Sequence, residues 1–271
     1  MSVRRYLSIL SRRITCNPII YNMYERMLWS QIKDGNKPEH IGIILDGNRR
    51  WANQHSLPPW MGHRFGSKKV DELLEWLLEL GVKTITLYVF STENFQRSKK
   101  EVEEIIQVIR EKAIKMNGPE SNSIHKKGIR VKTIGRVDLL PRDVHNVLHE
   151  IEEATKDYSN FYLNLAVAYG GRAEIVDATK KIAEEVEEGR MTLDQIDEET
   201  FEQHLYTSYL PKSDPDLIIR TSGEERLSGF LIWQAAYSEL CFLDVFWPDF
   251  RRIDLWRSIR TYQSRKRRYG Q

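Results

Sequence analysis

Short runs of β-branched and aliphatic residues alternate with segments of helical periodicity along this chain, and this alternation restricts the fold more than any other feature. Six runs have the composition of strands, at 41–45, 84–90, 129–135, 161–169, 216–220 and 239–246. Strands separated by helices form parallel pairs, because a parallel connection must cross over the sheet. The sequence therefore predicts an α/β fold, a single domain with a central, mostly parallel six-stranded sheet flanked by helices on both faces.

The segments between the runs carry apolar residues at helical spacing. In 70–80 such residues recur at i, i+3, i+4 and i+7, and 102–113 repeats the pattern. We also expect helices over 140–155 and 170–189. The stretch 19–32 has a similar spacing, which suits a helix packed on the body or one lying on a bilayer surface, and packing is the interpretation that we prefer.

Composition excludes several classes of protein. A net charge of +2 over 271 residues is too small to indicate nucleic acid as a partner. The two cysteines, Cys16 and Cys241, lack metal-binding spacing, which suits a reducing compartment. No apolar stretch approaches the ~18 residues of a membrane span. We therefore expect a cytoplasmic protein that binds no nucleic acid.

Polar residues follow several of the predicted strands directly. Asp46 follows the first run, Glu93 and Asn94 follow the second, and Arg220 and Arg226 end or follow the fifth. Ligands of parallel α/β sheets bind beyond the carboxyl ends of the strands. Charges of both signs are thus expected to converge at one edge of the sheet.

The stretch after the first run suits a metal-bound phosphate. Gly47 and Asn48 allow a tight turn whose backbone N–H groups face an anion, and Arg49 and Arg50 add guanidinium donors. Asp46 would repel a phosphate unless a divalent cation such as Mg²⁺ bridges the two. Taken alone, the stretch is better explained by an aspartate helix cap beside a surface arginine pair.

The loop after the fifth run favours a ligand site over a helix cap. Arg220 and Arg226 stand six residues apart with Ser222 and Ser228 beside them, an arrangement that suits a diphosphate. Three polar loops at one sheet edge favour a ligand site over coincidence. Aromatic residues in or beside these loops indicate that the ligand also has a hydrophobic body. They are Trp51, Phe90, Phe95, Trp233 and Tyr237.

At these residues the chain resembles the cis-prenyltransferases, the family of the undecaprenyl and dehydrodolichyl diphosphate synthases. The resemblance runs in the family order over roughly residues 38–270. The matching segments are HIGIILDGNRRWA (40–52), GHRFG (62–66), TLYVFSTENFQRS (86–98), NLAVAYGGR (164–172), DLIIRTSGEERLSGFLIWQAAYSEL (216–240) and FWPDF (246–250).

The resemblance implies an undecaprenyl diphosphate synthase-like fold, with an N-terminal helical extension at 1–37 and a catalytic domain at 38–271. It implies a Mg²⁺-dependent prenyltransferase that adds isopentenyl diphosphate to an allylic diphosphate with Z geometry and releases pyrophosphate. The product would be a polyprenyl diphosphate, a precursor of a lipid glycosyl carrier. The enzyme would be a homodimer that meets the membrane peripherally through its product.

The resemblance also implies roles for individual residues. Asp46 and Asn94 would be catalytic, and Asp46 and Glu239 would bind the metal. Arg268 and Gly270 match a C-terminal motif that reaches the partner's site. The substrate-binding residues would be Gly47, Asn48, Arg49, Arg50, Trp51, His63, Ser91, Thr92, Glu93, Phe95, Arg97, Arg220, Arg226, Leu227, Ser228, Arg268 and Gly270.

The chain departs from the family pattern at three positions. Pro59 stands where many bacterial members have an arginine, and Arg64 is a candidate replacement for that phosphate contact. Phe95 replaces a common tryptophan, a mild change. Glu225 replaces a histidine that often binds metal. The identity of the second metal ligand is therefore undecided, although a carboxylate at this position could also serve. Product length depends on the depth of an apolar tunnel, in which bulk near Val89 shortens the chain.

Two other functions remain as alternatives. A metal-dependent phosphatase with an aspartate after its first strand needs a second carboxylate two residues later, where this chain has Asn48. A non-catalytic accessory subunit of a heteromeric cis-prenyltransferase would keep the fold but lose the first motif, whereas Asp46, Asn94, Arg220 and Arg226 are all present here. An active enzyme is the expectation.

Overall fold

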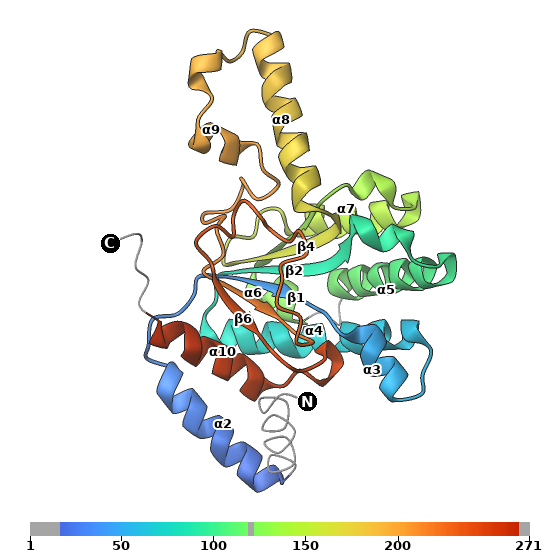
Figure 1. The fold of residues 1–271 in the computed structure, drawn as a ribbon, viewed down its shortest axis with the longest axis vertical. Helices are drawn as coiled ribbons and strands as arrows, with labels where there is room; N and C mark the ends of the chain where they lie inside the picture. Colours follow the sequence, from blue (N-terminus) through green and yellow to red (C-terminus); the bar gives the residue numbers. More distant parts are fainter. Residues whose placement is uncertain (1–16, 119–121, 266–271) are drawn as a thin grey trace.

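A six-stranded sheet forms the centre of the computed structural model, which describes residues 17–118 and 122–265 (Figure 1). The strand order is β3-β4-β2-β1-β5-β6, and all neighbouring strands are parallel. The strands are β1 (His40–Ile44), β2 (Thr84–Ser91), β3 (Ile129–Ile134), β4 (Phe161–Tyr169), β5 (Leu217–Arg220) and β6 (Glu239–Phe242). The predicted fold class is confirmed.

The last strand is shorter than its sequence suggests. Residues 243–246 continue the apolar run, but they leave the sheet. The N–H of Ser222 donates to the carbonyl of Val245 at 2.6 Å, and that of Gly223 donates to Leu243 at 2.8 Å. The end of the run is thus bound to the loop that follows β5, which helps to fix the shape of that loop.

The predicted helices are present. Helices α4 and α5 extend beyond the apolar repeats that predicted them, whereas α7 and α8 are slightly shorter than predicted. Helices α3 and α10, which flank the site and the sheet, were not predicted. The helices are α2 (Pro18–Ile32), α3 (Asn48–Gln54), α4 (Pro59–Leu80), α5 (Lys99–Asn117), α6 (Asn122–Lys127), α7 (Arg142–Thr155), α8 (Gly171–Glu187), α9 (Glu198–Gln203) and α10 (Arg252–Ser264).

The two faces of the sheet are covered unequally. The larger buried cluster lies on the face that carries α4, α5, α7 and α10. A smaller cluster lies on the other face, where Tyr88 stacks on Phe230 and meets Tyr169 edge to face. Helix α8 extends away from that side with α9 beside it (Figure 1). Irregular chain, rather than helices alone, therefore covers the second face.

Helix α2 packs on α10, as expected for the 19–32 stretch. The rings of Trp29 and Trp256 lie 5.1 Å apart, and Leu28 and Ile32 are fully buried. Within residues 17–118 and 122–265, no helix combines the length and the apolar character needed to cross a bilayer.

Two glycines bring α4 against the start of α3. A Cβ atom on Gly62 would lie 2.0 Å from the backbone oxygen of Asn48, and one on Gly66 would lie 2.3 Å from its side-chain oxygen. No side chain fits at either position. The i, i+4 spacing of these glycines places both on the face of α4 that meets α3, so they fix where α3 begins.

We expect Gly62→Ala to destabilise the protein by about 1–3 kcal/mol, because the added methyl group must push α3 from α4. Gly118→Ala is the matched control, because Gly118 has an ordinary φ of −77° and its nearest atom to an added Cβ would be 3.4 Å away. Urea unfolding of both variants measures the difference. Equal stabilities would refute the close packing of α3 on α4.

Candidate active site

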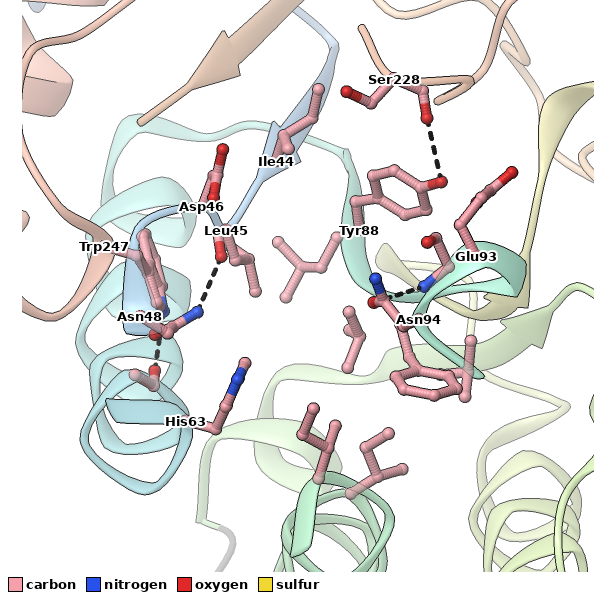
Figure 2. A pocket seen from close by; sticks show the side chains of 18 of the residues that line it. Ile44, Leu45, Asp46, Asn48, His63, Tyr88, Glu93, Asn94, Ser228 and Trp247 are labelled. Atoms are coloured by element: carbon pink, nitrogen blue, oxygen red, sulfur yellow. Dashed lines mark hydrogen bonds between the residues drawn. The ribbon is translucent and has the colours of Figure 1, made fainter. Parts of the chain in front are cut away.

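A cavity of about 1140 Å³ opens at the carboxyl edge of the sheet and continues between the sheet, α4 and α5. Its mouth is charged, and its depth is aliphatic. Figure 2 shows Asp46 and His63 on one side of the mouth, with Glu93 and Asn94 on the other. The predicted convergence of charges at this edge is present in the structure.

Asp46 is fixed at the mouth by backbone contacts with the buried Thr221. The Asp46 N–H donates to the Thr221 hydroxyl at 3.0 Å, and that hydroxyl donates to the Asp46 carbonyl at 2.7 Å. The carboxylate accepts from Arg220 Nη2 at 2.8 Å and from Arg50 Nη2 at 3.4 Å. Its side chain is half-buried and lines the cavity.

Opposing effects act on the pKa of Asp46. Burial alone would raise this pKa, but hydrogen bonds from Arg220 and Ser222 and the charges of Arg220 and Arg50 outweigh burial and lower it. Asp46 is therefore ionised at neutral pH, as a metal ligand must be.

Arg220, the last residue of β5, is buried beneath the mouth. Its Nη1 donates to the Ser228 hydroxyl at 2.8 Å and to the carbonyl of Arg226. Among the described residues, its Nε has no hydrogen-bond partner. Ser222 and Ser228 adopt left-handed φ values of 83° and 49°. Strained residues of this kind gather at ligand sites, and the contacts of Arg220 hold this loop in shape.

Glu224 holds two arginines at the rim. Arg50 Nη1 donates to Glu224 Oε1 at 2.9 Å, and Arg226 Nη1 donates to Glu224 Oε2 at 2.5 Å. Arg50 also donates to the Ser222 hydroxyl at 2.7 Å. Because Arg226 is largely exposed, its pair with Glu224 is weak and easily exchanged for an anionic ligand.

The loop after β2 presents Asn94 with a defined orientation. Residues Thr92–Gln96 form a 3₁₀ turn in which Asn94 Oδ1 accepts the N–H of Ser91 at 3.0 Å. Because its oxygen is engaged, Asn94 has its Nδ2 donors left for a ligand. The carboxamide is therefore set up to donate hydrogen bonds rather than to accept a proton.

Glu101 is a buried carboxylate shared by three basic side chains. Its Oε1 lies 3.0 Å from Arg97 Nη1, 3.5 Å from Arg49 Nε and 3.8 Å from His63 Nε2. The nearby His63 ring and the charges of Arg97 and Arg49 lower the pKa of Glu101, against the effect of its burial. This carboxylate positions two cavity-lining arginines and the histidine from behind.

Aliphatic side chains line the depth of the cavity. They come from the sheet and from the facing sides of α4 and α5, and they are Val70, Leu87, Val89, Ile105, Val108, Ile109, Ala113, Met116, Leu165 and Val167. The prediction of an apolar ligand body agrees with this lining, but four of its five aromatic residues do not contribute to it. Phe90 alone among the five lines the cavity.

Three predicted substrate-binding residues lie outside the lining. Trp51 Nε1 donates to Asp249 at 2.8 Å, away from the cavity. Phe95 packs edge to face on Phe90 at 4.8 Å and supports it from behind. Leu227 packs in the smaller apolar cluster. The other predicted substrate-binding residues in the described chain all line the cavity.

Glu239, which matches a family metal position, lies away from Asp46 within the chain. Glu239 begins β6 opposite Leu217, whereas Asp46 contacts Arg220, three residues further along β5. At the rise of a strand, these positions are separated by about 10 Å. Glu239 instead pairs with Arg265. Arg268 and Gly270 lie outside the described residues.

The structure also places the residues at which the chain departs from the family pattern. Arg64 does not replace the missing arginine at position 59, because it pairs with Glu104 and Glu111 on α5 and does not line the cavity. Glu225 is exposed and outside the lining. The neighbouring Glu224 is the acidic residue that contacts the rim arginines.

Within residues 17–118 and 122–265, no three His, Cys, Asp or Glu side chains gather into a group able to hold a metal ion. Asp46 nevertheless fits a metal that a diphosphate also binds, because Mg²⁺ is commonly held by one or two carboxylates together with substrate phosphates. An ionised, cavity-facing carboxylate surrounded by guanidinium groups meets that requirement.

The family model described as "Putative undecaprenyl diphosphate synthase" matches residues 44–270. A tritrans,polycis-undecaprenyl-diphosphate synthase (geranylgeranyl-diphosphate specific) of Pyrococcus horikoshii is 51% identical, over 92% of this chain and 93% of its own. A protein of the same name from Methanopyrus kandleri is 48% identical, over 99% and 100%. The crystal structure of lavandulyl diphosphate synthase from Lavandula x intermedia, in complex with dimethylallyl diphosphate, has a TM-score of 0.81 and 34% identity, covering 87% of this chain and 99% of its own.

The position of Glu101 beside His63 predicts how removal of the Glu101 charge changes the pKa of His63. Burial lowers the pKa of His63 below its usual 6.5, and Glu101 opposes that shift by favouring the protonated ring. In Glu101→Gln the opposing charge is gone, so the pKa of His63 should fall further. NMR titration of the ring protons measures both values. An unchanged or higher pKa in the variant would contradict the contact between Glu101 and His63.

Proposed function

The chain belongs to the undecaprenyl diphosphate synthase family, the cis-prenyltransferases, which elongate prenyl diphosphates in cis, and we propose that it adds isopentenyl diphosphate to geranylgeranyl diphosphate. The relatives of about 50% identity carry that primer in their names. The cavity is the main support for the proposal. Its charged mouth suits two diphosphates, and its aliphatic depth suits a long prenyl chain.

The primer's diphosphate is proposed to bind beside Asp46, at the start of α3. Gly47 has a left-handed φ of 101°, and a Cβ there would lie 2.6 Å from Phe246. Glycine therefore allows the turn that directs the first backbone N–H groups of α3 to the cavity. Arg49 and Arg50 add charge from the same turn.

Isopentenyl diphosphate is proposed to bind opposite, at Arg97, Arg220, Arg226 and Ser228. All four line the mouth. The guanidinium groups of Arg97 and Arg220 already have fixed partners in Glu101 and Asp46, whereas the exposed Arg226 can exchange Glu224 for the diphosphate. Preorganised cations of this kind stabilise a diphosphate without reorganising when it arrives.

The proposed reaction breaks the bond between the primer's allylic carbon and its diphosphate oxygen. A new carbon–carbon bond then forms to isopentenyl diphosphate, whose C2 proton is lost. Arg50 and the N–H groups of α3 stabilise the departing charge, and the aliphatic walls keep water from the allylic cation. Asn94 is proposed to donate a hydrogen bond that orients a diphosphate, while the released pyrophosphate accepts the proton.

We propose that Asp46 holds Mg²⁺ together with the primer's diphosphate. When bound, Mg²⁺ would neutralise the charge that develops on the leaving pyrophosphate. Asp46 supplies the carboxylate, and Arg220 keeps that carboxylate ionised and aimed at the mouth.

A homodimer is proposed as the active form, with contact to a membrane through the lipid product. Its support is the C-terminal Arg-x-Gly at Arg268 and Gly270 and the smaller buried cluster on the second face of the sheet. Val176 on α8, on that side of the molecule, has 48% of its surface exposed. The phosphatase and accessory-subunit alternatives have no comparable support.

Asp46→Asn should reduce kcat at saturating Mg²⁺ by at least about 100-fold, since the amide keeps the shape but cannot neutralise a metal ion. The fold should be unchanged by circular dichroism. Asp157→Asn, at an exposed position beyond α7, is the control and should keep full activity. Wild-type turnover by Asp46→Asn would remove Asp46 from the proposed mechanism.

Subunit mixing tests whether the C-terminal motif acts across a dimer. Truncation after Arg267 should raise the KM for isopentenyl diphosphate and lower kcat. Mixing this variant with inactive Asp46→Asn should restore activity, because one site in each mixed dimer then has both an intact Asp46 and an intact tail from its partner. If the mixture is no more active than the truncated variant alone, the tail does not act across the interface.

A further inference from the structure

One charged side chain interrupts the aliphatic depth of the cavity. Lys112 on α5 lines the cavity beside Ile109, Ala113 and Met116. Only 13% of the surface of its side chain is exposed to solvent. A buried ammonium group in an apolar channel is costly, so its placement there needs an explanation.

The ammonium group of Lys112 is held from α4. Its Nζ lies 2.5 Å from Asp71 Oδ1 and donates to the carbonyl of Ser67 at 3.1 Å. Burial lowers the pKa of Lys112, but the hydrogen bond and charge of Asp71 oppose the shift. Asp71 is itself 44% exposed at the surface. Lys112 thus closes the gap between α4 and α5 with a polar group.

Lys112 lies near the far end of the channel. Helix α5 runs from Lys99, close to the mouth residue Arg97, and it lines the cavity from Ile105 to Met116. At 1.5 Å per residue, Lys112 is about 10 Å beyond Ile105 along the helix. A prenyl tail that grows from the mouth passes about two aliphatic turns of α5 before it reaches this lysine.

We propose that Lys112, held by Asp71, is a specificity-determining residue that limits the length of the polyprenyl product. The inference rests on the proposed function of this same cavity. A hydrocarbon tail that extends past Lys112 must cover an ammonium group without offering it a hydrogen bond. Each tail that reaches this depth is thus less stable in the channel than a shorter one, and elongation ends.

Helix α5 offers a matched control in Lys115. Its Nζ also contacts Asp71, at 3.2 Å, but it is 56% exposed and does not line the cavity. Lys112→Met and Lys115→Met therefore remove the same charge from the same helix and the same partner. They differ in whether the lost charge faces the channel.

The experiment compares products of the wild type and both variants, made from geranylgeranyl diphosphate and radiolabelled isopentenyl diphosphate with Mg²⁺, then dephosphorylated and sized by mass spectrometry. Lys112→Met should lengthen the main product by at least one five-carbon unit, while the rate of the first condensation stays within twofold of wild type. Lys115→Met should leave the length unchanged. Lys112→Gln, polar but neutral, replaces Lys112→Met if thermal melting shows that the methionine variant does not fold.

An unchanged product length in a folded Lys112 variant would overturn the inference, as would equal lengthening in Lys115→Met. Both results differ from a failure of the proposed function, in which the wild type would form no condensation product from these two substrates.

Discussion

The ion pair between Asp46 and Arg220 is the interaction on which the site depends. The parallel pairing of β1 with β5 sets Ile44 opposite Arg220, so the chain beyond β1 must pass over the guanidinium group. Arg220 is buried, and a buried cation requires a partner. Asp46 supplies that partner and is in turn kept ionised. The same guanidinium group holds Ser228 and the carbonyl of Arg226, so one residue links the first and fifth strand ends.

The cations of the mouth are organised by carboxylates that stand behind them. Glu101 faces Arg97 and Arg49, and Glu224 faces Arg50 and Arg226. Without these anions, the arginines would repel one another in a half-buried space. With them, the excess positive charge that attracts a diphosphate remains, but each guanidinium group has a defined direction. The mouth is therefore assembled before any substrate binds.

Local sequence patterns and one topological rule were enough to predict the strands and the position of the site. Six strands were recognisable from their composition, and the rule that ligands bind at carboxyl strand ends placed Asp46, Asn94 and Arg220 together. Tertiary pairing was not predictable. From the sequence alone, Glu101 has the pattern of an exposed residue on α5. Its burial by His63 and Arg49 depends on tertiary contacts that no local pattern predicts. A motif also does not encode strand register, which sets Glu239 at the start of β6, away from Asp46. The role of Glu239 at a metal stays a prediction.

Helices α4 and α5 contribute residues to both the mouth and the depth of the cavity, and the residues of the two regions lie on different turns of each helix. Along α4, His63 lines the mouth, whereas Val70 lines the depth two turns later and the next residue, Asp71, holds Lys112 from outside the cavity. Along α5, Glu101 organises arginines, and the turns that follow are aliphatic as far as Lys112. Because helical neighbours lie three or four residues apart, a substitution in the depth does not contact the residues of the mouth. The chemistry of condensation and the room for the growing tail can thus vary independently on one pair of helices.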